Sequence, residues 1–164
     1  MPRHYVYRLS CDRGFAPNVE HGICSLSGCK SNTVELWTEK GSWVIGIGGK
    51  NTGKPNKLIF AMKAEENLPY REFRRKYPEK SKYLSYSKTA GPNVLVSREF
   101  YYFGNKAIEF PDHLKHIIWD RQGCKRVSDK DINKLERYLT ERYDYGKIGN
   151  PNNQNGCASY TSRT

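Results

Sequence analysis

The sequence predicts an α+β domain in which a small mixed or antiparallel, barrel-like sheet carries flanking helices. Strand-like and helix-like segments do not alternate regularly along the chain, which argues against a doubly wound parallel sheet. The length of 164 residues is typical of one compact domain. Only 37% of the residues are hydrophobic but 13% are aromatic, with 12 tyrosines, so the core must be rich in aromatic rings.

The first half of the chain predicts three strands and a long loop. Residues 4–10 are β-prone and alternate, so they predict an opening strand. Residues 11–33 are rich in Gly, Pro and Asn and predict a long loop of the kind that is often functional. Residues 34–37 could form a short strand or a helical turn. The apolar runs 42–47 and 58–63 flank a Gly/Asn/Lys turn and predict a hairpin.

The middle of the chain predicts one helix and two further strands. A short basic helix is expected at 69–77, because charged residues surround a few aromatic ones. Residues 81–93 are polar, contain Gly-Pro and predict a loop. The apolar runs 94–96 and 100–103 predict strands.

Two helices close the predicted domain. Residues 110–119 form a short helix with a proline at an early helical position. Ser128 caps the last helix, 129–143, whose apolar residues recur at helical spacing. We therefore expect a single domain at 1–146 and a flexible polar tail at 147–164.

Charge and hydropathy indicate the compartment and the kind of partner. Lys and Arg number 28 and Asp and Glu number 17, so the formal net charge is +11 and the pI is about 9.5. Such a field favours polyanions, namely nucleotides or nucleic acid. No apolar run is long enough to predict a membrane span, and the first residues resemble no export signal. We expect a cytoplasmic protein whose five cysteines are reduced.

Two familiar kinds of site are not supported by the spacing of their residues. Residues 48–54 match the phosphate-loop pattern G-x-x-x-x-G-K, but Pro55 replaces the hydroxyl residue that would bind magnesium, and a strand follows where a helix is needed. His21, Cys24 and Cys29 lie close together, but their spacing is wide for a zinc knuckle and no second matched pair exists. We expect no metal site and no cofactor.

Two segments combine cations with aromatic rings, as nucleic-acid-binding surfaces do. Residues 71–88 interleave seven Lys and Arg residues with tyrosines and a phenylalanine. A solvated helix face above core tyrosines would have the same pattern. The second cluster is Arg121, Lys125 and Arg126, where Gly123 would let the backbone approach a ligand.

Several stretches together resemble a known family, the second nucleotide-modification-associated domain family of bacteria and their viruses. The resemblance covers about residues 4–145. Its most specific parts are the Gly-Phe-Ala-Pro-Asn stretch at 14–18 and the region around Cys24 and Cys29. Also similar are Gly-Ser-Trp-Val-Ile-Gly at 41–46, Ile-Phe-Ala-Met-Lys at 59–63 and Phe-Tyr-Tyr-Phe-Gly at 100–104.

The resemblance implies a link to systems that modify bases in DNA. The two strand patterns at 41–46 and 59–63 are also similar to PUA-like barrels, whose EVE and ASCH relatives hold a flipped or modified base in a cleft. The chain departs from the family where Ser42 replaces a common Asp. It departs again at Cys124, where relatives have the His of a Gly-His-Arg element, so a catalytic role of that His could not apply here.

The first functional hypothesis is therefore a recognition domain for a base or nucleotide, in a DNA-modification or bacteriophage–host context. The family resemblance implies that this base or nucleotide is a modified one. An aromatic face would stack on the base, an amide would read its edge and cations would bind phosphate. The residues expected in these roles are Phe15 and Trp43 for stacking, Asn18 for the base edge, and Lys30, Arg121, Lys125 and Arg126 for phosphate.

Three alternatives remain open. The domain could be an enzyme on the same class of substrate, with Asp12 as an acid or base or Cys24 as a nucleophile. It could be a viral protein that sequesters a nucleotide signal, or a basic structural virion protein. The sequence does not indicate the oligomeric state.

Overall fold

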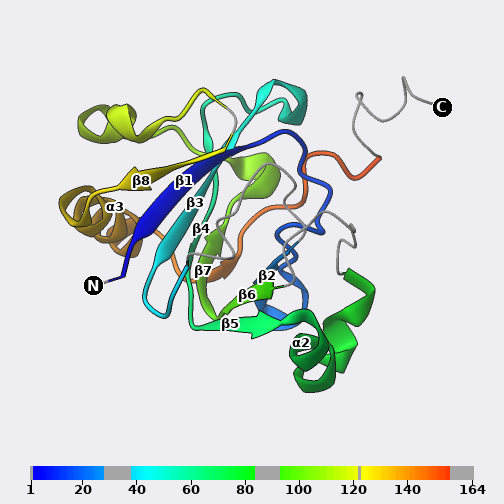
Figure 1. Ribbon diagram of the computed structural model, residues 1–164. Coiled ribbons are helices and arrows are strands. Elements are labelled where there is room, and N and C mark those ends of the chain that lie inside the picture. The colour runs from blue at the N-terminus through cyan, green and yellow to red at the C-terminus, as the bar shows by residue number, and fades with distance from the viewer. Residues whose placement is uncertain (1, 28–37, 84–92, 122, 156–164) are drawn as a thin grey trace.

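The structure is a computed structural model that describes residues 2–27, 38–83, 93–121 and 123–155. Within these residues the chain forms nine strands in two sheets, with few helices (Figure 1). The predicted α+β class with a mixed sheet and flanking helices is confirmed. The strands are β1 (His4–Leu9), β2 (Cys24–Leu26), β3 (Trp43–Gly48), β4 (Leu58–Lys63), β5 (Glu66–Pro69), β6 (Asn93–Ser97), β7 (Glu99–Tyr102), β8 (Cys124–Val127) and β9 (Gly146–Lys147).

The larger sheet has six strands in the order β8-β1-β3-β4-β7-β9. The β3–β4 pair is the predicted hairpin, and it pairs in antiparallel fashion. Strand β1 lies parallel to β3 and antiparallel to β8, and β9 lies parallel to β7. The sheet is therefore mixed, and β8 forms one of its edges.

The smaller sheet, β2-β6-β5, is a continuation of the larger one. Strand β4 is followed along the chain by β5, and β6 is followed by β7. Strand β4 pairs with β7, and β5 pairs with β6, so the two successive pairs form one ribbon. This long two-stranded ribbon bends between the sheets, so the smaller sheet folds over one face of the larger sheet. The core between them contains many rings, including Tyr5, Tyr7 and Phe60. This arrangement gives the barrel-like shape.

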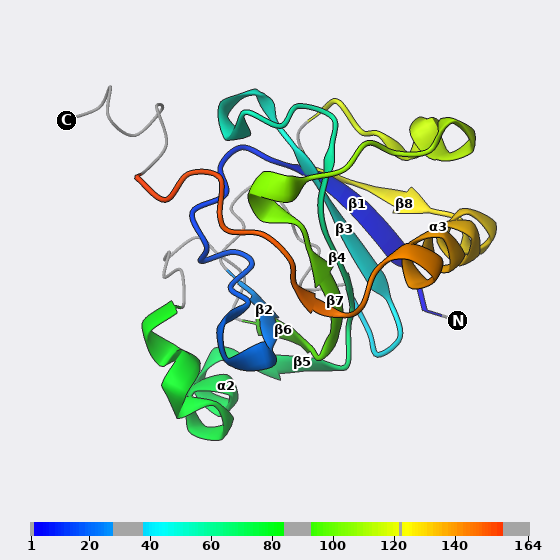
Figure 2. The same ribbon diagram turned by 180° about the vertical axis from the view of Figure 1, so that it is seen from behind.

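The other face of the larger sheet is covered by helices (Figure 2). The helix α3 (Asp129–Arg142) packs Ile132, Leu135 and Leu139 against this face. Its N-cap is Ser128, whose hydroxyl accepts a hydrogen bond from the backbone N–H of Asp131 at 3.1 Å, as predicted. The 3-10 helix η5 (Asp112–Ile117) lies in the predicted helix at 110–119 and adds Leu114 and Ile117 to the same core.

A third, smaller core lies under the helix α2 (Tyr70–Lys76), where Phe73 and Tyr77 pack against the smaller sheet. This helix confirms the one expected at 69–77. The remaining helices are short 3-10 turns: η1 (Glu20–Gly22), η2 (Lys50–Thr52), η3 (Pro78–Tyr83) and η4 (Gly104–Lys106).

Four strands were not predicted, and each lacks the signal that sequence reading uses. Strand β2 has three residues within the segment expected to be a loop. Strand β5 is polar and ends in a proline, which suits an edge position. Strand β8 carries Lys125 and Arg126, and charged residues on an edge strand discourage pairing with other chains. The fourth, β9, has two residues. The segment 34–37 lies outside the described residues.

The first part of the segment expected to be a tail, 147–164, contacts the rest of the domain. Residues 147–155 pack on the domain after β9 joins the larger sheet. The backbone N–H of Asn105 donates to the carbonyl of Asn150 at 2.7 Å. Glycine is needed for this contact, because a Cβ on Gly104 would lie 2.2 Å from that carbonyl oxygen and one on Gly149 would lie 2.0 Å from the Phe103 carbonyl oxygen. Residues 156–164 are outside the described part of the chain.

Candidate nucleotide-binding site

The loop between β1 and β2 is held by a buried lysine. The ammonium of Lys80, on η3, donates to Asn18 Oδ1 at 2.6 Å and to the Ile23 carbonyl at 2.7 Å. The carbonyls of Asn18 and Glu20 each lie 3.1 Å from the same nitrogen. Lys80 is fully buried, and this burial lowers the pKa of its ammonium to about 8, although electrostatic interactions with Cys24, Glu20 and Glu79 oppose the shift. The lysine therefore stabilises the loop from inside.

Asn18 uses its amide within this loop. Its Nδ2 donates to the Gly14 carbonyl at 2.8 Å, and its Oδ1 also accepts from the backbone N–H of Glu20 at 3.2 Å. The side chain is buried. A base edge could reach this amide only after these hydrogen bonds broke, so we do not keep Asn18 as a base reader.

Asp12 joins the same loop to the C-terminal segment. Its carboxylate accepts from the Tyr102 hydroxyl at 2.6 Å and from the backbone and side chain of Asn152 at 3.0 and 2.9 Å. Its backbone N–H donates to Asn153 Oδ1 at 2.9 Å. Burial, together with the Asp12 charge and hydrogen bond, raises the pKa of Tyr102 above its ordinary value. Asp12 thus has an architectural role in the structure.

Cys24 lies inside the core between the two sheets. Its side chain is fully buried, and its Sγ is 3.7 Å from the Met62 sulfur. Burial raises the pKa of the thiol to about 12, although the Lys80 charge opposes this shift. A thiol that stays protonated and covered is not an activated nucleophile. We therefore carry neither Cys24 nor Asp12 forward as a catalytic group.

The two predicted stacking residues differ in exposure. Trp43 is only 3% exposed and packs in the core on the helical side of the larger sheet. Its ring has no free face for a base. Phe15 is 39% exposed, and the Arg13 guanidinium lies 5.6 Å from its ring centroid. Phe15 therefore remains a candidate for stacking, with a cation beside it.

The predicted phosphate-binding residues of the C-terminal half lie around the edge strand. Arg121, Lys125 and Arg126, hereafter the β8 cations, are all exposed. No ion pair joins them to a carboxylate within the described part of the chain. Asp120 is the exposed acidic neighbour. Lys30, the remaining predicted phosphate ligand, lies outside the described residues.

The β8 cations reach both sides of the sheet edge. Register pairs Arg126 with Tyr5 and Lys125 with Val6, and cross-strand partners project to the same face. Arg126 is therefore on the side of the smaller sheet, whereas Lys125 is on the side of α3. There the Lys125 ammonium lies 5.6 Å from the ring centroid of Trp119.

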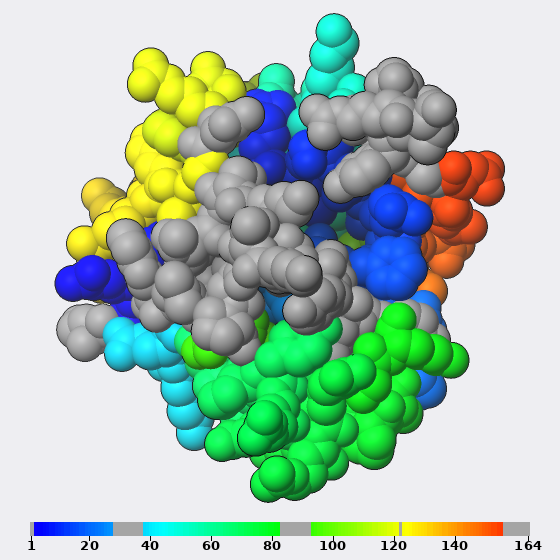
Figure 3. Space-filling model, turned by 45° about the vertical axis from the view of Figure 1, so that its right-hand side comes forward, coloured from blue at the N-terminus to red at the C-terminus, as the bar shows by residue number. Residues whose placement is uncertain are grey.

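The space-filling view shows how these parts are arranged (Figure 3). The yellow atoms of the segment around β8 lie along one side of this face. The blue atoms of the loop after β1 lie on the opposite side. The β8 cations and the exposed Phe15 thus belong to segments that flank one face of the molecule.

Sequence reading missed Lys80 as a structural residue, and it missed Arg8 and Trp119 altogether. Lys80 was included in the basic stretch 71–88, since burial of a lysine leaves no trace in the sequence. Arg8 lies in the segment 4–10, for which the sequence predicted only a strand. The Lys125–Trp119 contact had one signal, a tryptophan a few residues before a basic cluster.

The described residues contain no group of three or more His, Cys, Asp or Glu side chains that could hold a metal ion. Cys24 and Cys124 are free, but Cys11 is disulfide-bonded, which corrects the expectation that all five cysteines are reduced. In the described residues, no helix has the length and apolar character needed to cross a bilayer.

Fold and surface together define a small basic α+β domain with exposed cations on an edge strand. The chain belongs to the family described as nucleotide modification associated domain 2, which it matches over residues 1–86 and 74–158. The family resemblance noted in the sequence is thereby confirmed. The comparison with curated proteins found no match.

One solved structure is similar to this chain. It is described as the crystal structure of ASCH from Zymomonas mobilis, and it is 11% identical with a TM-score of 0.43. The match covers 82% of this chain and 94% of that chain. At this level of similarity we draw no functional argument from it.

Proposed function

We propose that this domain recognises a nucleotide or a nucleic-acid base, and that the base is a modified one, in the setting of DNA modification or of conflict between phage and host. Membership of the nucleotide modification associated family supports this class of ligand. The net charge of +11 supports an anionic partner.

The observation that carries the proposal is the set of β8 cations. These three cations are exposed and have no carboxylate partner in the described residues; Lys125 and Arg126 lie on the four-residue edge strand, and Arg121 lies shortly before it. Unpaired cations repel one another and are favoured where an anion neutralises them. In our proposal Arg121, Lys125 and Arg126 bind phosphate, and Trp119 beneath Lys125 adds an aromatic face.

Phe15, on the loop after β1, is the proposed stacking residue, since its ring is 39% exposed. Its loop is held in place by Lys80 and Asp12, so the ring would be presented without a large ordering cost. The buried positions of Cys24 and Asp12 favour binding over the alternative in which these residues act on the ligand.

The test is a titration of a fluorescein-labelled oligonucleotide followed by anisotropy, at two salt concentrations. The variant R121E/K125E/R126E should lose affinity about 100-fold at low salt, and its salt slope should fall by about 0.7 per lost contact on a single strand. The matched control is R71E/R74E/R75E, which reverses three exposed cations on α2 and should bind nearly as well as the parent.

Free nucleotides, plain and modified, are then added as competitors. Competition by one nucleotide would support a base site, and the Phe15→Ala variant should weaken it. Equal losses in both triple variants would contradict the proposal, because they would indicate attraction by net charge alone. Tight binding of a free nucleotide, together with an oligonucleotide affinity that does not depend on strand length, would instead favour a domain that sequesters a nucleotide signal.

A further inference from the structure

The turn that follows β3 is fixed against the segment that precedes β8. The guanidinium of Arg8, on β1, donates to the Trp119 carbonyl at 3.0 Å through Nε and to the Gly48 carbonyl at 3.0 Å through Nη1. It also donates to Asn56 Oδ1 at 2.6 Å through Nη2. One side chain thus joins three segments that are far apart in the sequence.

A second set of hydrogen bonds holds the same turn from the other side. The Asn153 amide donates to the Asn51 carbonyl at 2.9 Å, and Asn153 is itself held by Asp12. The backbone N–H of Gly49 donates to the Leu9 carbonyl at 2.8 Å. The turn around η2 is therefore placed as precisely as the strands beside it.

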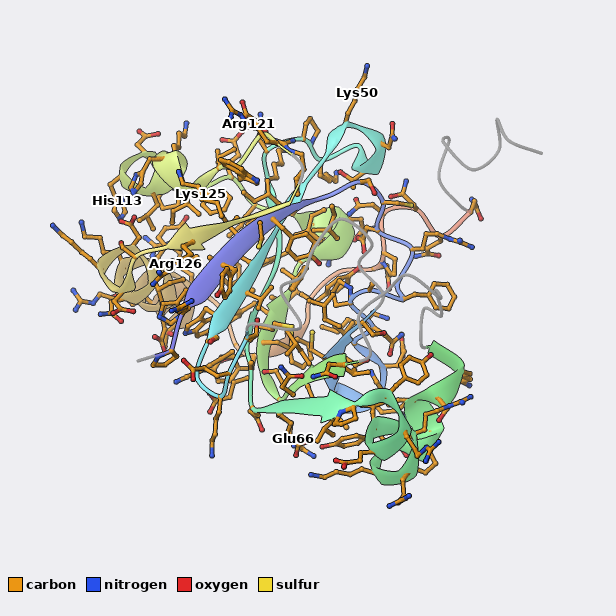
Figure 4. All side chains as sticks on the ribbon, viewed as in Figure 1. Lys50, Glu66, His113, Arg121, Lys125 and Arg126 are labelled. Carbon is orange, nitrogen blue, oxygen red and sulfur yellow. The ribbon has the colours of Figure 1, made fainter. Side chains whose placement is uncertain are left out.

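This turn carries its own cations. Lys50 is exposed at its tip, and Lys54 lies half-buried four residues later. Neither forms an ion pair with another described residue. Figure 4 shows Lys50, Arg121, Lys125 and Arg126 following one another along one margin of the molecule. We call the β8 cations together with Lys50 and Lys54 the basic ridge.

We infer that the basic ridge binds the phosphate backbone of a nucleic-acid strand several nucleotides long, so that the partner is a polymer and not only a free nucleotide. This inference rests on the proposed function and extends it. A single nucleotide needs one cluster of cations, whereas the ridge presents two clusters that Arg8 holds at a fixed separation. Successive phosphates of one strand supply the matching row of charges.

Arg8 is the positioning residue of this ridge. All of its described hydrogen bonds go to the protein, and its side chain is half-buried, so its charge contributes little to contact with a ligand. An Arg8→Lys variant keeps the charge but cannot reach three acceptors with a planar fork. It should loosen the η2 turn relative to Trp119 without removing a ridge cation.

The experiment measures the affinity of labelled oligodeoxythymidylates of about 4, 8 and 16 nucleotides, chosen to bracket one site. The parent protein should bind more tightly as length increases. The K50E/K54E variant should weaken binding of the longest probe about 10-fold and lower its salt slope by about 1.4, since about 0.7 is lost per contact. The shortest probe, held by the β8 cations, should change little. The control R71E/R75E should change neither.

The R8K variant should weaken the longest probe about 3-fold with no effect on the shortest, and circular dichroism checks that it is folded. The inference of a polymer-binding ridge is overturned if affinity does not increase with oligonucleotide length, or if K50E/K54E has no effect on it. The proposed function survives that result if R121E/K125E/R126E still abolishes nucleotide binding. If neither set of variants changes any binding, both proposals fail. Equally tight binding of polyglutamate would also overturn the inference, since it would show that the ridge attracts any polyanion.

Discussion

Two regions of this molecule have similar basic sequences but differ in how their cations are held. The segment 70–83, which forms α2 and η3, exposes Arg71, Arg74 and Arg75 but engages two of its other cations internally. Lys76 pairs with Glu66, and Lys80 is buried among carbonyl oxygens. The basic ridge contains five cations, none of them in an ion pair with a described residue. Figure 4 places Glu66 and the labelled ridge residues in different parts of the molecule.

This difference shows that a count of Lys and Arg does not locate a binding surface. In the segment 70–83 the aromatic residues Phe73 and Tyr77 are buried, and the Tyr77 hydroxyl bonds to Glu66 at 3.1 Å. These aromatic rings therefore contribute to the folded structure and not to a surface for stacking bases. On the ridge, four of the five cations are exposed and Lys54 is half-buried. Arg8 joins the two segments that carry them through the Trp119 and Gly48 carbonyls, which suits contact with an external anion.

The largest effect should follow from removing the buried cation of segment 70–83. Lys80→Met would leave the oxygens of Asn18 and Ile23 without their donor in a buried loop. We expect the free energy of unfolding to fall by about 3 kcal/mol or more, since each buried unsatisfied group costs about 1–3 kcal/mol. Urea denaturation measures this change.

The matched control is Arg75→Met, which removes an exposed cation of the same region and should leave the urea midpoint nearly unchanged. Where Lys80→Met still folds, its ridge should bind oligonucleotides with the parent salt slope. A stability equal to that of the control would show that Lys80 is not the internal support of the loop.

The pH dependence of stability should separate the two regions further. Burial lowers the pKa of Lys80 in the folded state to about 8, below the value near 10.5 in the unfolded chain. Between these values the unfolded chain binds more protons, so stability rises with pH as Lys80 loses its charge. The slope is at most about 1.4 kcal/mol per pH unit for one proton.

Cys24 acts in the opposite direction at higher pH. Its pKa is raised from about 9 to about 12 by burial, so the unfolded chain loses this proton first and stability falls above pH 9. The clearest window is therefore about pH 7.5–9, which includes the pKa of Lys80 and ends where Cys24 begins to titrate in the unfolded chain. In this window the urea midpoint of the parent should rise more steeply with pH than that of Lys80→Met. The same pH dependence in both proteins would contradict the lowered pKa of Lys80.

Sequence reading succeeded where the chain is locally consistent. A few adjacent residues are enough to predict β3 and β4, from their apolar runs, and the last helix, from the Ser128 cap and the spacing of Ile132, Leu135 and Leu139. Strand β8 has no such local signal, because an edge strand that carries Lys125 and Arg126 has no apolar alternation.

The site residues were harder to predict for a different reason. Arg121, Lys125 and Arg126 were found from charge alone, and the structure adds that they are exposed and unpaired with described carboxylates. Asn18 and Trp43 have side chains suited to bases but are buried. The exposure of a side chain depends on contacts between segments that are distant in the sequence, such as Lys80 with Asn18. Neighbouring residues do not predict such contacts.

The smallest effect should come from making the segment 70–83 more like the ridge. Glu66→Gln removes the charge that pairs with Lys76 but keeps a side chain able to accept from Tyr77. One freed, exposed cation adds at most one weak phosphate contact, so oligonucleotide affinity should rise by about 2-fold at low salt and not at high salt. Anisotropy titrations of the parent and the variant at both salt concentrations measure this. A gain as large as the loss in R121E/K125E/R126E would show that the two regions differ only in ion pairing, whereas a 2-fold gain would mean that the fixed geometry of the ridge also contributes to binding.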